Sequence, residues 1–546
     1  MTTLDWMVLF GWLAFLVSYG LWRGRGSTSV NQYLLAGKTM PWYAMGLSIM
    51  ATQASAITFI STTGQGFVDG MRFVQFYFGL PIAMVILSAT AVPIFHRAKV
   101  YTAYEYLEKR FDAKTRSLVT AIFLIQRGLG AGIALAAPAI VMSVVLGWSY
   151  HVTTVVMGGL VILYTTMGGI KAVTHADVQQ MMVIMFALML SFGIAVSLLP
   201  RDVSFLDVVK LAGAAGRLNV VDTSLDWNNR YNLWSGLIGG TFLMLAYFGT
   251  DQSQVQRYLT GKSIAQSRLG LLLNAVAKVP VQFFILFIGS IVFVFFLFER
   301  PPLVFHPLEM KRIEQSTGYA DLQARYDQAL QAREAAARRV IAGAPAAELG
   351  AAQKQVETVR SDAQKLTHES DTNYIFLSFV TRYLPHGVVG LILGVIFTAA
   401  MSASSGEINS LATVSMIDVY QRHIHKHGLD RHYLTASRLA TVFWGIYAVA
   451  FANYAQGFGA LIEAVNQVGS LFYGSMLGVF FIAFFMKNVR GTAAFWGVVV
   501  GQLAIFFVAR FTSIAYLWYN VVGALVVVSV SYALSLIAAP QVRDSA

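Results

Sequence analysis

Apolar runs long enough to cross a bilayer recur along the whole chain. About 20 apolar residues suffice for a helix to span the hydrocarbon core, and by that measure we expect about 13 membrane segments. They lie near 5–22, 42–67, 73–95, 117–147, 152–170, 175–199, 231–249, 270–298, 387–416, 434–452, 457–485, 492–511 and 515–537. The pattern predicts an all-α, polytopic membrane protein.

The run 43–66 departs from a simple apolar helix. Thr52, Gln53, Ser55 and Thr58 place polar side chains near the expected bilayer midplane, with alanines between them. Polar groups at that depth are tolerated only where they face protein or a water-lined cavity. Two interpretations fit: an interrupted helix whose freed carbonyls bind substrates or ions, or a helix that packs closely through its small residues.

A second segment, Leu233–Arg257, has the same character. The pair Gly239–Gly240 is expected to weaken the helix, and the segment ends in an amide-rich stretch. A broken first helix in each of two five-helix halves is typical of inverted-repeat transporters. The predicted organisation is a peripheral N-terminal helix and inner loop (1–41), a first repeat (42–199), an external loop (200–230), a second repeat (231–485), and two peripheral C-terminal helices with a tail (486–546).

Composition supports the membrane interpretation. Hydrophobic residues make up 56% of the chain and charged residues 12%, with a mean hydropathy of +0.60. The first apolar run is followed by Arg23 and Arg25 and has no evident cleavage site, so we expect it to remain as the first membrane helix. Cysteine is absent from the sequence, which excludes disulfides and thiolate metal sites.

The net charge of +12 raises the question of a nucleic-acid partner. The basic residues, however, gather in alternate short loops, as the positive-inside rule describes. We therefore expect the lipid bilayer, and no nucleic acid, as the surrounding partner. The predicted topology is a multi-pass protein of the plasma (inner) membrane, with its N-terminus outside and its C-terminus in the cytoplasm.

The stretch 299–372 is polar, with nearly balanced basic and acidic residues. Long loops cross the membrane regardless of charge, so the stretch does not upset the predicted topology. Leu349, Val356, Val359 and Leu366 recur at helical spacing after a turn, which predicts an external helical hairpin. We favour a solvated insertion packed on the outer face, and a hairpin that binds a protein partner is the alternative.

Charges inside the predicted spans are candidates for function, because each is costly unless it is paired or hydrated. Arg127, Lys278, Glu407 and Glu463 qualify. Arg127 could clamp a substrate carboxylate or pair with Glu407 as a structural bridge, and the bridge is slightly preferred.

Four histidines crowd the loop after the segment 387–416. A metal site would need at least three convergent ligands at fixed geometry. Alternating histidines beside Arg422 and Lys426 are more typical of a solvated, positively charged loop. The four are His423, His425, His427 and His432.

Five stretches, in order along the chain, carry a resemblance to a known family. They are YLLAGKTMPWYAMGLSIMATQASA (33–56), YTTMGGIKAVTHADVQQ (164–180), YFGTDQSQVQRYL (247–259), IFTAAMSASSGEINSLATVSMIDVY (396–420) and GSLFYGSMLGVFFIAFFMKNVRGTAAFWG (469–497). The sequence resembles the sodium:solute symporter family, whose members carry glucose, proline, pantothenate, iodide or sialic acid. The resemblance implies a leucine-transporter-type core of ten helices over 42–485, flanked by one helix before and two after.

The resemblance also implies a sodium site. Its carbonyl ligands would be Ala51 and Ala54 on the broken first core helix, and Ala399 on the eighth. Ser402 would add a hydroxyl, but Ala403 stands where the family has a second one. Sodium prefers several hard oxygen ligands, so the loss of one is expected to weaken the site.

Some members of the family have a second, deeper sodium site, which Asp177 and Ser405 match. Thr398, Ser402 and Ser405 fall on one face of a helix and offer replacement hydroxyls. The alternative is that these hydroxyls only bond back to helix carbonyls.

The solute is less well determined. Gln53 and Thr58 can bond a polar ligand, and Arg127 could hold a carboxylate. Ile57 stands where a glucose-type carrier has a polar group, so a pyranose held in that way is not favoured. The expected function is sodium-coupled symport of a small polar or anionic organic solute (a sugar, carboxylate or vitamin-like molecule) into the cell by alternating access.

Three alternatives remain beside this expectation. A proton-coupled symporter is the nearest, motivated by Ala403 together with Asp177 and Glu407. A membrane sensor that uses the hairpin is less favoured. An enzyme is not expected, because the sequence shows no nucleophile–base or metal-ligand constellation. Na⁺ is expected as the coupling ion, with no organic cofactor.

Overall fold

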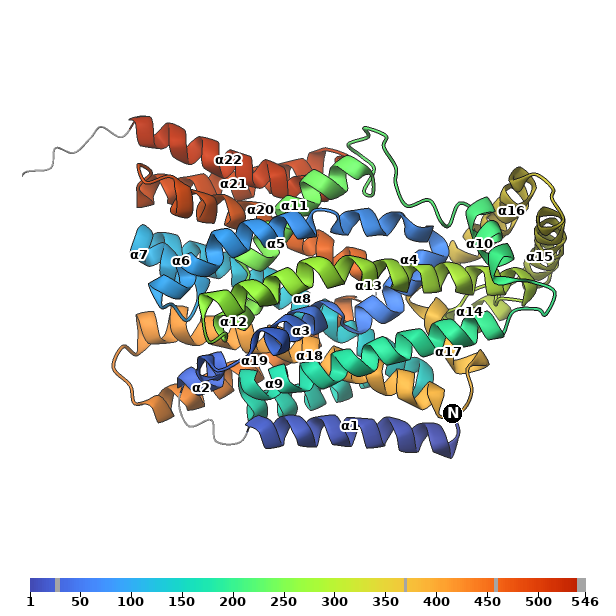
Figure 1. Ribbon diagram of the computed structural model, residues 1–546, viewed down its shortest axis with the longest axis horizontal. Helices are drawn as coiled ribbons and strands as arrows, with labels where there is room; N and C mark the ends of the chain where they lie inside the picture. Colours follow the sequence, from blue (N-terminus) through green and yellow to red (C-terminus); the bar gives the residue numbers. More distant parts are fainter. Residues whose placement is uncertain (25–29, 368–370, 456–459, 538–546) are drawn as a thin grey trace, which may run out of the picture.

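The computed structural model describes residues 1–24, 30–367, 371–455 and 460–537. Over these residues the chain is helical and forms no β-strand, which confirms the predicted all-α class (Figure 1). Four predicted features lie wholly or partly outside the described residues: part of the first inner loop (25–29), residues 368–370 of the insertion 299–372, the start of the segment 457–485, and the C-terminal tail (538–546).

The long helices follow the apolar runs of the sequence. Within the described ranges, eleven spans are long and apolar enough to cross a membrane, and counting one bent pair as a span makes twelve. One of the eleven, Gly70–Ala98, is made of shorter consecutive helices. The predicted segments 152–170 and 175–199 form one assigned helix, α9, with two apolar stretches, Tyr150–Met167 and Val173–Ser197. The long helices are α1 (Thr3–Gly24), α8 (Ala113–Leu146), α9 (Tyr150–Ser197), α13 (Ile264–Phe298), α18 (Val388–Val414), α19 (Asp430–Ala455), α20 (Leu461–Phe485), α21 (Gly491–Phe511) and α22 (Leu517–Ile537).

Shorter helices complete the described chain. They are α2 (Val30–Leu35), α5 (Leu80–Ala89), α6 (Ala91–Ala98), α7 (Ala103–Arg110), α10 (Phe205–Ala214), α14 (Pro307–Glu314), α17 (Ile375–Tyr383), and the tight helical turns η1 (Ala36–Lys38), η3 (Gly70–Tyr77) and η5 (Thr372–Tyr374). The end of α18 continues as a wider π-type turn, η6 (Ser415–Ile424).

The run 43–66 is an interrupted helix, as one of its two interpretations predicts. α3 (Trp42–Gln53) ends at Ala54, and the chain resumes as η2 (Thr58–Thr62) and α4 (Thr63–Val68) with a bend of 62°. The bend ends the i→i−4 hydrogen-bond ladder of α3, and a helix end leaves backbone groups to be satisfied by other partners. The break is therefore a place where carbonyl ligands become available.

The second interrupted segment breaks at a different point from the predicted glycine pair. η4 (Ser235–Gly239) runs directly into α11 (Gly240–Gly249), so Gly239 and Gly240 lie within helical structure. The backbone leaves the helix at Thr250, and Asp251 caps the next helix, α12 (Gln252–Leu259). The glycines instead allow close packing, since a Cβ on Gly240 would meet the carbonyl of Phe76 at 2.8 Å.

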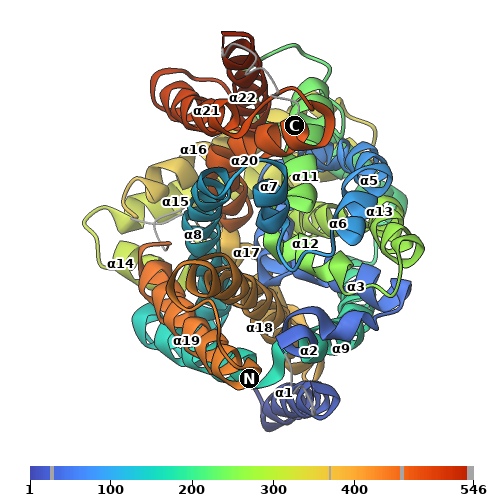
Figure 2. The ribbon, with the colours of Figure 1, turned by 90° about the vertical axis from the view of Figure 1, so that its left-hand side faces the viewer.

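The helices named so far form one bundle with two peripheral parts (Figure 2). α21 and α22 pack on each other and on α20 at one edge. α1 lies at the opposite edge against α9 and α18. The carboxylate of Asp5 fixes α1 there, because it accepts the backbone N–H of Gly387 at 2.6 Å just before α18 begins.

The insertion, residues 299–372, contains the predicted hairpin. α15 (Tyr319–Ile341) and α16 (Ala346–Gln364) pack together at the same end of the molecule as the N-terminus (Figure 1). Leu349, Val356 and Val359 are buried, whereas Leu366 is 54% exposed. The apolar face of α16 is thus largely used inside the insertion.

Candidate functional site

A buried cavity of about 90 Å³ lies beside the break in α3. Gln53, Ser55 and Ile57 contribute to its wall from the break itself. The rest of the wall comes from α3, η3, α8, α11, α18 and α20, and consists of Thr52, Phe76, Tyr77, Gln126, Arg127, Ala134, Leu243, Met244, Tyr247, Ala403, Glu407, Ile462, Val465, Asn466 and Tyr473.

The three predicted solute residues have different positions. Gln53 and Arg127 line the cavity. Gln53 also donates to Asn274 Oδ1 at 3.2 Å, which links the break to α13. Thr58 is not part of the wall, and its hydroxyl donates to the carbonyl of Gln53 at 2.7 Å. That bond stabilises the interrupted backbone.

Arg127 lies between two carboxylates. Its Nη1 is 3.0 Å from Glu407 Oε1, and its Nη2 donates to Asp251 and, at 2.6 Å, to the hydroxyl of Tyr473. The predicted contact with Glu407 is therefore present, and Arg127 is 2% exposed. A buried guanidinium needs such partners, because an unpaired charge at this depth is costly.

Asp251 is a residue that the sequence interpretation missed. It is fully buried, accepts the Tyr473 hydroxyl at 2.9 Å, and caps α12 through the backbone N–H of Ser253. The available signal was local: an aspartate just before a short helix is a preferred N-cap. Nothing in the sequence pattern pointed from that cap to Arg127.

Asp177 and Ser402, predicted for sodium, lie in direct contact. The Ser402 hydroxyl donates to Asp177 Oδ1. Ser48 donates to Oδ2 at 2.5 Å, and the guanidinium of Arg257 contacts the same oxygen at 2.7 Å. All four side chains are at most 3% exposed. Asp177 therefore joins α3, α9, α12 and α18.

The remaining predicted sodium ligands are buried on α3 and α18. Ala51 and Ala54 belong to the end of α3, and Ala399 to α18, which packs against α3. The hydroxyl of Ser405 donates to the carbonyl of Ser402 at 3.1 Å, the back-bonding that the sequence left open. Thr398 bonds back to Gly394 at 3.0 Å.

Lys278 is a further buried cation near the cavity. Its ammonium lies 5.5 Å from the ring centre of Tyr77, a cavity residue. Among the described residues no hydrogen-bond partner reaches this ammonium. An aromatic face stabilises a cation only in part. Lys278 therefore differs from Arg127, which has two carboxylate partners.

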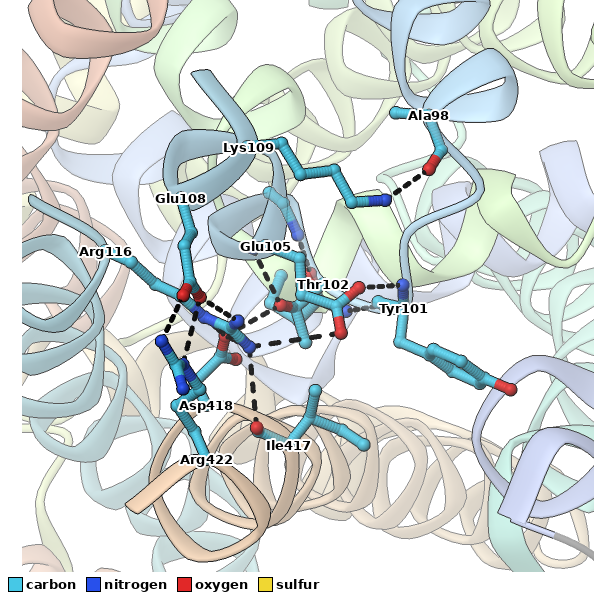
Figure 3. A network of polar contacts seen from close by, with 12 residues as sticks. Ala98, Tyr101, Thr102, Glu105, Glu108, Lys109, Arg116, Ile417, Asp418 and Arg422 are labelled. Carbon is cyan, nitrogen blue, oxygen red and sulfur yellow. Dashed lines mark hydrogen bonds and ion pairs between the residues drawn. The ribbon is translucent and has the colours of Figure 1, made fainter. Parts of the chain in front are cut away.

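Far from the insertion, a polar network joins α7 to the start of α8 and to η6 (Figure 3). Arg116 contacts Asp418 at 2.6 Å and Glu108 at 2.7 Å. Arg422 also binds Glu108, and Thr102 donates to Asp418 at 3.0 Å. The sequence alone gave neither arginine a partner.

The other sequence candidates have structural partners. Glu463 accepts Arg230 at 2.5 Å and the Tyr231 hydroxyl at 2.6 Å. The rings of His425 and His432 lie 4.6 Å apart. Within the described ranges no group of three His, Cys, Asp or Glu side chains could hold a metal ion.

Comparison with known proteins decides the family. The model of the sodium:solute symporter family matches residues 33–315 and 346–501, which leaves out all of α15. The chain belongs to the sodium:solute symporter family. It is therefore a multi-pass membrane protein and a secondary transporter with Na⁺ as its coupling ion. The family and the relatives described next are transporters and not enzymes.

Individual relatives are distant but cover nearly the full length. A sodium/sialic acid symporter of Aliivibrio fischeri is 26% identical, over 97% of this chain and 92% of its own. A sodium/glucose cotransporter of Vibrio parahaemolyticus is 26% identical over 91% and 83%. A solved outward-open structure of a Na⁺-coupled sialic acid symporter has a TM-score of 0.77 at 23% identity, covering 99% of both chains. That likeness supports the fold.

Proposed function

We propose that this symporter carries a small polar organic solute into the cell with sodium, through the cavity beside the break in α3. One observation carries the proposal: α3 and α18, the two helices that hold the predicted ligands Ala51, Ala54, Ala399 and Ser402, both contribute residues to the cavity wall. Solute and sodium would thus both contact α3 and α18, and through these shared helices binding of one can favour binding of the other.

The sodium ligands proposed are the carbonyls of Ala51, Ala54 and Ala399 and the hydroxyl of Ser402. Asp177 on α9 and Ser405 on α18 would serve a second, deeper sodium site. The contact between Ser402 and Asp177 supports a link between the two sites. Hard oxygen ligands of this kind suit Na⁺, while the missing hydroxyl at Ala403 leaves the first site one ligand short.

The solute is proposed to be held mainly by hydrogen bonds. Gln53 lies in the wall, and Glu407 Oε2 and Gln126 Oε1 have no partner among the described residues. Arg127 already contacts two carboxylates, so a solute anion would have to displace Glu407 from it. Hydroxyl and amide groups of a sugar or vitamin-like molecule fit this wall with less rearrangement.

A carboxylate solute is the second candidate, and Lys278 is the observation that favours it. A buried ammonium without a carboxylate partner could balance the charge of an anion that enters beside Tyr77. Replacing Lys278 with Met separates the candidates, because uptake of a carboxylate would be lost while uptake of a neutral solute would persist.

For topology we propose the N-terminus outside and the C-terminus in the cytoplasm, from the distribution of basic loops. The insertion then faces the exterior, and its buried apolar face supports a structural element over one that binds a protein partner. Residues 42–199 and 231–485 are proposed as inverted repeats that alternate access to the cavity.

The test is uptake by purified protein in liposomes, with sugars, carboxylates, amino acids and vitamins as solutes. Uptake that requires an inward sodium gradient, and that persists when the proton gradient is collapsed, is the expected result. Uptake driven by a proton gradient without sodium would establish the proton-coupled alternative instead. The same solutes are expected to raise thermal stability more in sodium than in potassium, because a ligand of the folded state stabilises it.

A further inference from the structure

Arg257, at the end of the amide-rich stretch, is a buried arginine that contacts a carboxylate. It lies in the last turn of α12, the helix that Asp251 caps, and it is 1% exposed. Its Nη1 contacts Asp177 Oδ2 at 2.7 Å and also donates to the hydroxyl of Ser48. Its Nε and Nη2 have no hydrogen-bond partner among the described residues.

The groups that Arg257 engages are sodium ligands in chemical type. Asp177 offers the carboxylate proposed for the deeper sodium site, and Ser402 donates to the other oxygen of that carboxylate. A sodium ion bound by Asp177 and Ser402 would lie within about 4–5 Å of the guanidinium, where two positive charges repel strongly at low dielectric. One carboxylate cannot compensate both charges fully.

We propose that Arg257 is a tethered cation that competes with sodium for Asp177. Sodium binding weakens or displaces the Arg257–Asp177 ion pair, and return of the guanidinium helps to expel the ion. Since α12 follows the break in the second interrupted segment, movement of that segment would set how strongly Arg257 competes. This inference rests on the proposed sodium site and adds a residue that sets sodium affinity and release.

Gly406 provides a way to test the competition without removing a charge. It lies on α18 one turn after Ser402, and a Cβ there would overlap the Nη2 of Arg257. Nη2 ends a flexible side chain and has no hydrogen bond to lose, so the added methyl would push the guanidinium aside. Gly394 is the matched control on the same helix, because the atoms nearest to its Cβ would belong to Trp12, at 3.2 Å, and Leu9 on α1, and not to Arg257.

The experiment measures the sodium dependence of thermal stability and of uptake for Gly406→Ala, Gly394→Ala and Arg257→Gln. For Gly406→Ala we expect the half-saturating sodium concentration to fall about threefold. For Arg257→Gln we expect a fall of about tenfold, which corresponds to about 1.4 kcal/mol. Gly394→Ala is expected to match the wild type. Sodium efflux under exchange conditions is expected to slow in the first and third variants.

The outcomes separate this inference from the proposed function. If wild-type protein shows no sodium effect on stability or uptake, the sodium site itself fails. If the wild type responds to sodium but folded Gly406→Ala and Arg257→Gln keep its sodium affinity, the competition is refuted. Weaker sodium binding in both variants would also refute it, because Arg257 would then support the ion. Should Arg257→Gln fold poorly, Gly406→Ala alone decides the question against its glycine control.

Discussion

The guanidinium of Arg127 on α8 contacts the carboxylate of Glu407 on α18 at 3.0 Å, across 280 residues of sequence. The same guanidinium binds Asp251 at the break between α11 and α12. One buried cation therefore connects a helix of each proposed repeat with the second interrupted segment. Any movement of α18 against α8 must stretch or exchange one of these contacts.

Thermal unfolding of Arg127→Gln, Glu407→Gln and the double variant tests this bridge. Arg127→Gln is expected to cost about 3–5 kcal/mol, because it leaves buried carboxylates unpaired. The double variant should recover part of that loss, with a coupling of about 1 kcal/mol or more. Recovery stays partial because Asp251 remains unpaired. A coupling energy near zero, in a cycle run beside a remote Asp5→Asn control, would reject the bridge to Glu407 and leave Asp251 as the carboxylate partner of Arg127.

Ser402→Ala is expected to raise the half-saturating sodium concentration for uptake about tenfold, as loss of one bond to a charged group would. The hydroxyl both donates to Asp177 and is a proposed sodium ligand. Ser404→Ala is the matched control, because Ser404 is equally buried on α18 and its hydroxyl has no partner among the described residues. Unchanged sodium affinity in Ser402→Ala would remove this residue from the site.

Deleting residues 312–366 with a short Gly/Ser linker is expected to preserve sodium-dependent uptake but lower thermal stability. Leu303 and Val304 pack against the hairpin and would be exposed by its removal. Arg217, which contacts Glu357 at 3.0 Å, would lose a partner. Radiolabelled uptake and melting temperature are measured on protein that inserts into the membrane. Complete loss of uptake in a well-folded deletion protein would show that the insertion takes part in transport.

The network of Figure 3 is expected to weaken in acid. Burial raises the pKa of Glu108, but hydrogen bonds from Arg116 and Arg422 outweigh it and hold the pKa below its usual 4.5. A carboxylate with a lowered pKa stabilises the fold above its unfolded pKa and loses that effect as pH falls through the folded value. The stability difference between wild type and Glu108→Gln should therefore be full above about pH 5 and shrink below pH 4.5.

Glu334→Gln serves as the control in this comparison. Glu334 pairs with Arg338 on the exposed side of α15, where ion pairs contribute little. A stability difference for Glu108→Gln that stays constant from pH 7 to about pH 4 would contradict a role for its ionised form.

The sequence by itself determined the elements that depend on local pattern. The length of apolar runs predicted the membrane helices, since a bilayer of fixed thickness imposes that length. Polar and small residues around Gln53 indicated the break in α3, because lipid does not tolerate such groups. The spacing of Leu349, Val356 and Val359 predicted the hairpin. All three are buried, Val356 and Val359 inside the insertion and Leu349 in the main core of the bundle.

Only the tertiary structure decided which charges meet. Arg127 was expected to pair with Glu407 but contacts Asp251 as well. Arg257, which the sequence placed only at the end of an amide-rich stretch, is buried against Asp177. Apolar spacing reports which side of a helix avoids water. Apolar spacing does not report which helix lies opposite. A buried ion pair depends on that neighbouring helix, because the pair forms only where two distant segments bring opposite charges within a few ångströms.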